Sequence, residues 1–197
     1  MSDERRADAE MAAWPVSLAG VTESVVTTLG PNELWNAAPL GLHAGEPVTA
    51  RTWGNTRTRR NFHRQSEGYV QFIDDPVVFA DAALSIVERE EPILESACAW
   101  ARVAVECVDA GNEGDTEWEE WELRPLESGV ERETVPTIDR GFGAVVEATV
   151  AASRLGVPAY DDAELRDRLT YFESVVDRAG GPREREALER VRDYSSW

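Results

Sequence analysis

The sequence predicts a mainly β protein of the α+β class, in which a β-rich part is followed by a helical C-terminal segment. Short runs rich in valine, threonine and aromatic residues, separated by glycine and proline, fill the first two-thirds of the chain. From Gly141 onward the apolar residues recur every three or four positions, as on one face of a helix. The chain has 197 residues, of which 42% are apolar, so it is long enough to bury a core.

These patterns divide the chain into a polar leader over residues 1–14, a β domain over 15–137 and a helical segment over 138–197. We expect the helical segment to pack on the β domain or on a dimer. Several short strands at close spacing favour a barrel or a sandwich. Four runs have the composition of such strands, at 16–30, 34–43, 47–53 and 68–73.

Two short helices are predicted between the strands. The polar run "TRTRRNFHRQ" at 56–65 has Thr58 as a candidate N-cap and lacks β-branched residues after it. The run "DDPVVFADAALSI" at 74–86 places Asp75 as a cap and Pro76 at the first helical position.

A long hairpin is predicted from "ACAWARVAVECVDAG" and "DTEWEEWELRPL", which a glycine-containing turn separates. Trp118 and Trp121 fall on opposite faces of a regular strand, unless the two glutamates between them form a bulge. We expect one tryptophan to pack into the core or a dimer contact and the other to cover a flank. Cys98 and Cys107 are nine residues apart, on opposite faces of one strand, so no disulfide is expected.

Three helices are expected in the C-terminal segment. The first ends near Gly156 and carries one buried stripe, made of Phe142, Val145, Val146, Thr149 and Val150. The second begins with Asp161 and Glu164, which are spaced like a capping box. Its inward residues are Leu165, Leu169, Phe172, Val175 and Val176. The third begins at Pro182 and buries Leu188 and Val191.

The charge is strongly negative and excludes several classes of partner. The chain has 38 acidic residues against 20 arginines and no lysine, which gives a net charge of −18. This charge argues against binding to nucleic acids or to anionic membranes. An acidic surface without lysine predicts a salt-rich, halophilic cytoplasm, where carboxylates are screened from one another. The absence of an apolar run of 18 residues or of a signal-like start also favours the cytoplasm, and two separated histidines give little support for a metal site.

A basic island interrupts this acidic sequence at residues 47–66. It contains five arginines and no acid, where the average density predicts about four acids. Thr56, Arg57 and Thr58 place one guanidinium and two hydroxyls at the start of a predicted helix, which is typical of a phosphate site. The alternative is a solvated surface on which the arginines pair with neighbouring carboxylates.

The run "NAAP" is the second candidate for a binding element. Ala37, Ala38 and Pro39 are small or flat, so a planar ligand can lie against the backbone, and Asn36 offers both a donor and an acceptor. The alternative is a strand that bends at a proline.

In combination these elements resemble a known family. The string "ESVVTTLG…NELWNAAPLGLH…GNTRTRRNF…GYVQFIDDPVVFADAAL…DRGFGAVVEATVAASRL" is similar to the archaeal family called domain of unknown function 447, in the flavin-reductase-like, FMN-binding split-barrel group. The family pattern of Asn, small, Ala, Pro and Gly matches Asn36 to Pro39 and Gly41. Its second pattern matches Thr56, Arg57, Thr58, Asn61 and Phe62. One departure is Asp139-Arg140, where the family usually has Asn-Arg.

The resemblance implies a six-stranded antiparallel split β-barrel that forms a homodimer and holds FMN at the dimer interface. Residues 36–39 would lie along the isoalloxazine ring and residues 56–58 near the phosphate, while Asn61 would anchor the loop. The implied function is an FMN-dependent oxidoreductase that acts on an unknown small molecule or on another flavin, with NAD(P)H as a donor and no assigned catalytic residue. A deazaflavin in place of FMN stays open.

Two other function classes remain. A non-catalytic flavin-binding or electron-transfer module would keep the phosphate site but lack a roomy pocket over the ring. A phosphate-dependent RNA or nucleotide binder could use the same arginines, but the net charge opposes it, because nucleic-acid binders normally spread basic charge over a face.

Overall fold

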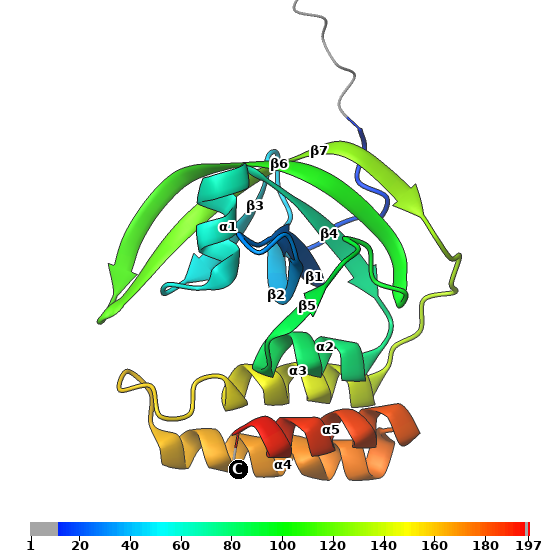
Figure 1. The fold of residues 1–197 in the computed structure, drawn as a ribbon. Coiled ribbons are helices and arrows are strands. Elements are labelled where there is room, and N and C mark those ends of the chain that lie inside the picture. The colour runs from blue at the N-terminus through cyan, green and yellow to red at the C-terminus, as the bar shows by residue number, and fades with distance from the viewer. Residues whose placement is uncertain (1–11, 196) are drawn as a thin grey trace, which may run out of the picture.

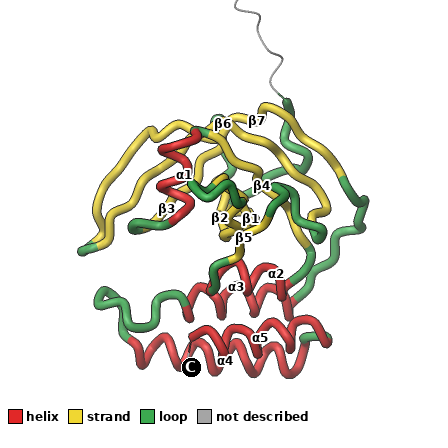
Figure 2. Tube along the Cα trace, in the orientation of Figure 1, coloured by secondary structure: helices red, strands yellow, loops and turns green. Residues whose placement is uncertain are grey.

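The structure is a computed structural model that describes residues 12–195 and residue 197 (Figure 1). Residues 1–11 of the predicted leader therefore lie outside the described part. Trp14 packs edge-on against Phe72, with 6.5 Å between the ring centroids. The remaining chain forms a β-barrel above a layer of helices (Figure 2).

Six antiparallel strands close into a barrel, in agreement with the fold that the family resemblance implied. The strand order is β1-β4-β6-β7-β3-β2, and β2 pairs with β1 to close the ring. A short strand that the sequence did not predict, β5 (Val87–Arg89), adds to β2 from outside the ring. The barrel strands are β1 (Val21–Leu29), β2 (Trp35–His43), β3 (Val48–Trp53), β4 (Glu67–Ile73), β6 (Ala97–Glu113) and β7 (Thr116–Val130).

Strand β1 is buried on both faces, because it lies between the barrel interior and the helices. Val26 points into the barrel core, and its neighbour Val25 packs outward with Phe79 and Leu94. Five consecutive residues of β1 are buried as a result, which explains why its sequence is a continuous Val/Thr run without alternation.

The long hairpin of β6 and β7 forms as predicted, with Gly114 at its tip in the left-handed region at a φ of +59°. Trp121 is 2% exposed in the barrel core, while Trp118 lies half-buried on the other face under the Arg51 guanidinium. The two tryptophans thus lie on opposite faces, as expected. The pairing of β6 with β7 has two irregularities, one between Arg102 and Val103 and one between Cys107 and Asp109, while the register of β7 with β3 is unbroken. Cys98 and Cys107 are both free.

Two helices lie between the strands. In α2 (Pro76–Leu84), Asp75 accepts hydrogen bonds from the backbone amides of Val77 and Val78, which confirms the predicted cap. In α1 (Arg57–Gln65) the predicted cap was wrong: Thr56 has the extended backbone of an N-cap, and its hydroxyl accepts from the Arg59 amide. Thr58 is instead the second residue of the helix.

The C-terminal helices α3 (Arg140–Ala152), α4 (Asp162–Ala179) and α5 (Pro182–Ser195) pack with α2 into the helical layer, in which α2 and α3 lie next to the barrel and α4 and α5 on their far side (Figure 1). The single stripe predicted for α3 was wrong, because this helix packs on two sides. Small residues on one side allow a close approach to α4 and α5, whereas Phe142 and Val146 pack toward the barrel. The buried residues of α3 are Gly141, Ala144, Val145, Ala148, Thr149, Ala151 and Ala152.

Helices α4 and α5 follow the sequence pattern closely. Asp161 caps α4, but Glu164 pairs with Arg168, one turn further along, so the pattern marks the helix start without a reciprocal capping box. The inward residues of α4 are buried as predicted, except that Phe172 is only partly so. Leu188 and Val191 of α5 are both buried.

Packing within the helical layer generates a stability prediction. Leu169 is fully buried between the helices, so Leu169→Ala should lower the free energy of unfolding by about 2–5 kcal/mol. Urea unfolding at one fixed high salt concentration measures the change. Leu126→Ala is the control, because Leu126 is 40% exposed on β7 and its truncation should change stability by about 0.5 kcal/mol or less. Equal losses in the two variants would contradict this packing.

Candidate functional site

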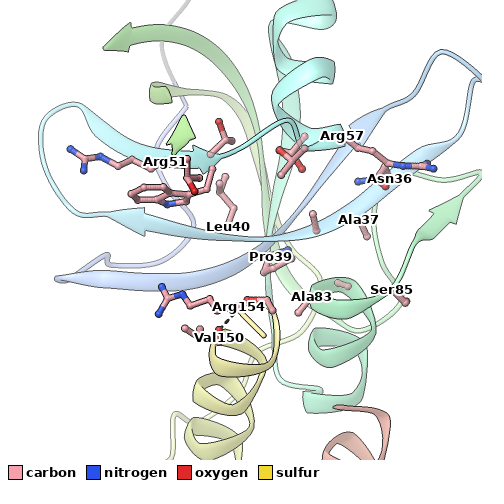
Figure 3. A pocket seen from close by; sticks show the side chains of 18 of the residues that line it. Asn36, Ala37, Pro39, Leu40, Arg51, Arg57, Ala83, Ser85, Val150 and Arg154 are labelled. Carbon is pink, nitrogen blue, oxygen red and sulfur yellow. Dashed lines mark hydrogen bonds between the residues drawn. The ribbon is translucent and has the colours of Figure 1, made fainter. Parts of the chain in front are cut away.

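A cleft of about 890 Å³ separates the barrel from the helical layer on one side of the molecule (Figure 3). Strands β2 and β3 and the start of α1 form its barrel wall. The end of α2, the end of α3 and the loop after α3 form the opposite wall. The cleft thus brings together the two elements that the sequence singled out, residues 36–39 and residues 56–58.

The 36–39 element lies where one edge of β2 is open. Strand β2 pairs with β1 along its whole length, but its other edge pairs with β5 only at 35–37 and with β3 only at 42–43. Residues 38–41 therefore have no strand partner on the second edge. Pro39 is tolerated there because a proline has no N–H to donate, and on an unpaired edge this interrupts no hydrogen-bond ladder. The small side chains of Ala37 and Ala38 keep the cleft wall low and flat.

Asn36 supplies a polar group at this wall. Its side chain is 6% exposed and lines the cleft. The side-chain amide of Asn36 forms no hydrogen bond with another residue in the described part of the chain, although a buried side-chain amide normally has partners. Such a group is suited to a ligand that offers both a donor and an acceptor.

The start of α1 forms the second half of the site. Gly54, at a φ of +64°, turns the chain after β3, and Thr56 then caps the helix. Arg57 and Thr58 follow in the first turn, where the backbone amides are free of helical partners. Thr58 is 5% exposed and lines the cleft, and its hydroxyl has no hydrogen-bond partner among residues 12–195. These donors fit an anion at the helix N-terminus.

Arg57 already has a carboxylate partner in this structure. Its guanidinium pairs with Glu88 of β5, and the amide of Asn32 donates to the same Glu88 oxygen at 3.3 Å. The Arg57 and Glu88 side chains are 41% and 27% exposed, so the pair is partly solvated and contributes little stability. An anion that binds Arg57 would therefore compete with the Glu88 carboxylate for this guanidinium.

Two of the predicted site residues do not line the cleft. Gly41 faces β1, and a Cβ atom there would lie 3.2 Å from Val21 Cγ1. Asn61 is 3% exposed and donates to the Thr28 hydroxyl at 2.9 Å, while its oxygen accepts from Arg64 at 2.8 Å. Asn61 therefore anchors α1 to β1.

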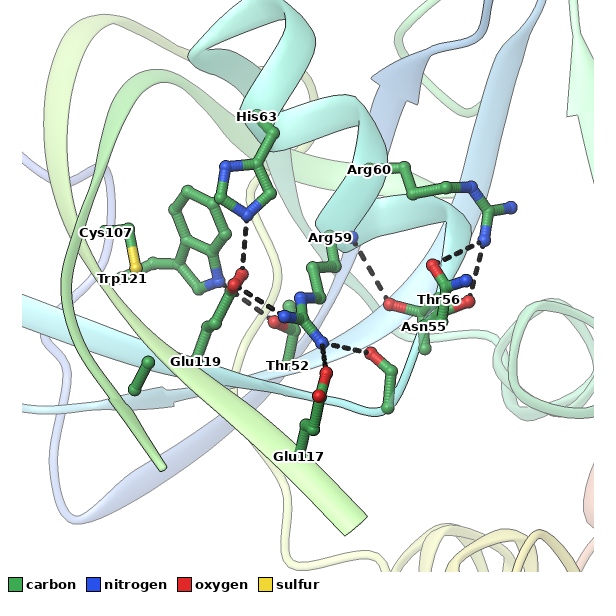
Figure 4. A network of polar contacts seen from close by, with 12 residues as sticks. Thr52, Asn55, Thr56, Arg59, Arg60, His63, Cys107, Glu117, Glu119 and Trp121 are labelled. Atoms are coloured by element: carbon green, nitrogen blue, oxygen red, sulfur yellow. Dashed lines mark hydrogen bonds and ion pairs between the residues drawn. The ribbon is translucent and has the colours of Figure 1, made fainter. Parts of the chain in front are cut away.

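A charged network holds α1 against the hairpin (Figure 4). Glu119 of β7 accepts from Arg59 at 2.7 Å and lies 2.8 Å from His63 Nε2, and its side chain is only 8% exposed. Arg59 also pairs with Glu117 at 3.0 Å and donates to the Gly54 carbonyl. The sequence analysis missed this network, because the partners are 56 or more residues apart and the glutamates of β7 resemble a solvated face.

The network reaches the cleft through Trp121. The Trp121 indole donates to the Thr52 hydroxyl at 2.9 Å, and Thr52 lines the cleft. Phe62 and His63 of α1 both pack edge-on against the same indole, with ring centroids 5.1 and 4.9 Å away. The contacts of Trp121 thus fix the start of α1 relative to the cleft wall.

These contacts lower the pKa of the Glu119 carboxyl. Burial favours its neutral form, but the hydrogen bonds from Arg59 and His63, together with their charges, outweigh burial and hold the pKa of Glu119 below its ordinary 4.5. Glu119 is therefore a carboxylate at neutral pH.

The sequence analysis missed further lining residues, most of which come from parts of the chain that are distant from both elements. Val150 was predicted to belong to the buried stripe of its helix but is half-buried and lines the cleft. At Asp139 the chain departs from the family pattern, and the Asp139 carboxylate caps α3 by accepting a hydrogen bond from the Phe142 backbone amide. The other residues that the sequence analysis missed are Leu40, Arg51, Thr52, Trp53, Ala82, Ala83, Ser85, Ile86, Glu113, Thr116, Ser153, Arg154, Val157 and Tyr160.

Neither a metal cluster nor a membrane helix is present in the described residues. No three His, Cys, Asp or Glu side chains of this part are grouped as metal ligands. None of its helices is both long enough and apolar enough to span a bilayer.

Comparison with known families assigns the chain. The N-terminal family model, described as protein of unknown function (DUF447) N-terminal domain, matches residues 22–132, and the model described as protein of unknown function (DUF447) matches residues 139–193. The chain belongs to the DUF447 family. The resemblance expected from the residues is thereby confirmed.

Solved structures include a member of the same family. An FMN-bound DUF447 protein from Methanosarcina mazei is 26% identical, with a TM-score of 0.75, and the match covers 89% of this chain and 95% of that one. Component B of nitrilotriacetate monooxygenase from Bacillus cereus is 17% identical, with a TM-score of 0.42 over 58% of this chain and 71% of that one. The styrene monooxygenase flavin reductase from Pseudomonas putida is 13% identical, with a TM-score of 0.39 over 59% and 83%.

The charged network predicts a pH-dependent stability. Because the folded-state pKa of Glu119 is lowered, its ionised form stabilises the fold above pH 4.5, and this contribution is lost as the pH falls through the folded-state pKa. Glu119→Gln should therefore lower the free energy of unfolding by about 1–3 kcal/mol at pH 7. Below pH 4.5 the difference from the wild type should shrink.

Urea unfolding of both proteins at pH 7 and pH 4 measures this effect. Glu120→Gln is the matched control, since Glu120 pairs with Arg51 on the more exposed face of β7 and should contribute less than about 1 kcal/mol. A loss for Glu119→Gln that is equally large at both pH values would mean that shape, and not charge, matters at this position.

Proposed function

We propose that this DUF447 protein binds FMN in the cleft and acts as an oxidoreductase on a small molecule or another flavin. The observation that carries the proposal is the meeting of the open β2 edge with the start of α1 in one cleft, where Asn36 and Thr58 are nearly buried but lack protein partners. The FMN-bound relative from Methanosarcina mazei, which aligns over 89% of this chain, supports the choice of ligand.

The residues fit the two halves of this cofactor. Ala37, Ala38 and Pro39 offer a flat wall for the ring, and the Asn36 amide would hydrogen-bond its polar edge. The hydroxyls of Thr56 and Thr58, the Arg57 guanidinium and the free amides of α1 would hold the phosphate. When bound, the flavin supplies the redox chemistry by accepting and donating electrons.

The size of the cleft favours an oxidoreductase over a module that only carries a flavin. About 890 Å³ is near the upper end of the roughly 300–1,000 Å³ typical of ligand sites. A substrate or a nicotinamide donor would therefore have room beside the ring. Consumption of NAD(P)H by the FMN-loaded protein, with release of reduced product, tests the catalytic part of the proposal.

Arg57 provides the most selective test of the cofactor site. Arg57→Ala removes a charge-assisted bond to the phosphate, so FMN affinity should fall about five- to thirtyfold, or about 1–2 kcal/mol for a half-exposed guanidinium. Riboflavin has the same ring without the phosphate, so its affinity should change little. Fluorescence titration of both ligands at one salt concentration measures the two changes.

Thr58→Val should show the same selectivity at smaller size, because a neutral hydroxyl contributes less than a charged donor. If Arg57→Ala weakened FMN and riboflavin equally, the phosphate would not lie at this helix.

Glu88 should compete with the phosphate for Arg57. Glu88→Gln removes the competing charge, so FMN affinity should rise by up to about fivefold, the worth of a partly exposed ion pair. Riboflavin affinity should stay constant. Glu90→Gln, on the exposed segment just after β5, is a control that should leave both affinities unchanged. A lower FMN affinity in Glu88→Gln would show that Glu88 supports the site.

We also infer a homodimer in a salt-rich cytoplasm. The segment between β7 and α3 exposes apolar side chains, with Val135 at 87% and Ile138 at 98%, which a second copy would cover. The 18 excess negative charges per chain repel across such an interface when screening falls. Light scattering should therefore find a dimer in molar salt that loosens at low salt. A monomer at every salt concentration would contradict the inference.

A further inference from the structure

The cleft has a second end, which lies away from Asn36 and Arg57 (Figure 3). Arg51 and Arg154 lie at this end, on the opposite side of the view from Asn36 and Arg57 (Figure 3). Arg154 follows the last turn of α3, and Tyr160 lies in the loop that comes next. Trp53 of β3 lines the cleft as well.

The arginines of the cleft differ in what they contact. Arg51 is bonded to Glu120 at 3.1 Å, and Arg57 is paired with Glu88. Arg154 is different, because no carboxylate in the described part of the chain forms an ion pair with it. Its guanidinium stacks instead on the Tyr160 ring, 5.0 Å from the ring centroid.

The contacts of Arg154 leave its guanidinium available to a ligand in the cleft. Several other arginines of the described residues, Arg166 among them, form no ion pair either, but of these only Arg154 lines the cleft. Stacking on Tyr160 holds the planar guanidinium in place while leaving its N–H groups available. Trp53 and Tyr160 both line the cleft and are 41% and 44% exposed, so two aromatic side chains are available to contact a ligand.

We propose that Arg154 forms an anion subsite that takes the carboxylate or phosphate group of a co-substrate bound beside the flavin. The location of the subsite beside the flavin rests on the proposed function, whereas the subsite itself is formed by the Arg154 and Tyr160 side chains. A planar guanidinium is well suited to either group, because both present two oxygens to its N–H fork. Glu113 at the tip of β6 also lines the cleft and would exclude anions from that part of the wall.

The competing explanation is structural. Arg154 lies just beyond the C-terminus of α3, where a cation stabilises the helix dipole by about 0.3–1 kcal/mol without any ligand. On this explanation Arg154→Gln would lower stability and leave ligand binding unchanged. Thermal unfolding of each variant separates this effect from a loss of binding.

Ligand-observed saturation-transfer NMR on the full chain provides the test. Benzoate and phenyl phosphate represent the two anionic groups, and benzamide is the neutral probe of the same shape. Each is titrated without flavin and then with FMN, in the same potassium chloride concentration. Arg154→Gln is compared with Arg166→Gln, a control on α4 that is exposed and lies outside the cleft.

At least one anion should bind the wild type and the Arg166→Gln variant and weaken about tenfold in Arg154→Gln, while benzamide binds weakly to all three. The anion that weakens identifies the group as a carboxylate or a phosphate. Anion binding that is equal in Arg154→Gln and the wild type, or no stronger than benzamide binding, would overturn the subsite. The flavin-free titration keeps this result separate from FMN binding, so a failure of FMN to bind would overturn only the proposed function.

Discussion

The incomplete pairing of β2 is the constraint on which the candidate site depends. One edge of this strand is paired with β1 over its full length, whereas the other edge is paired only at its two ends. The open stretch over residues 38–41 tolerates Pro39 and exposes a flat wall built from small side chains. A fully paired edge would have required a neighbouring strand in the space where the cleft now lies.

The second requirement is that α1 begins at a fixed position next to this wall. Asn61 ties the helix to β1, and Glu119 ties it to β7 through Arg59 and His63. Both anchors are nearly buried, so they hold the helix more firmly than surface ion pairs would. In the first turn, the Thr58 hydroxyl has no partner among the described residues, and the Arg57 guanidinium has only the exchangeable contact with Glu88. Rigid anchoring behind an open first turn is the arrangement that a preorganised anion site needs.

Local patterns in the sequence predicted most of the fold and singled out both elements that line the cleft. Turn residues and β-branched runs marked the barrel strands, and the 36–39 and 56–58 elements do line one cleft. Three features escaped because their causes are not local. Strand β5 has only three residues, too few to show a period. The two-sided packing of α3 depends on what lies on each side of it. Partners such as Arg59 and Glu119 meet only when the barrel closes.

A structure of the protein with FMN tests the central claim most directly. The account predicts the phosphate within hydrogen-bonding distance of the Arg57 guanidinium, the Thr58 hydroxyl and the first amides of α1, with Glu88 displaced from Arg57 and the ring against residues 36–39. A phosphate at the Arg154 end of the cleft, or a flavin bound elsewhere on the molecule, would contradict it.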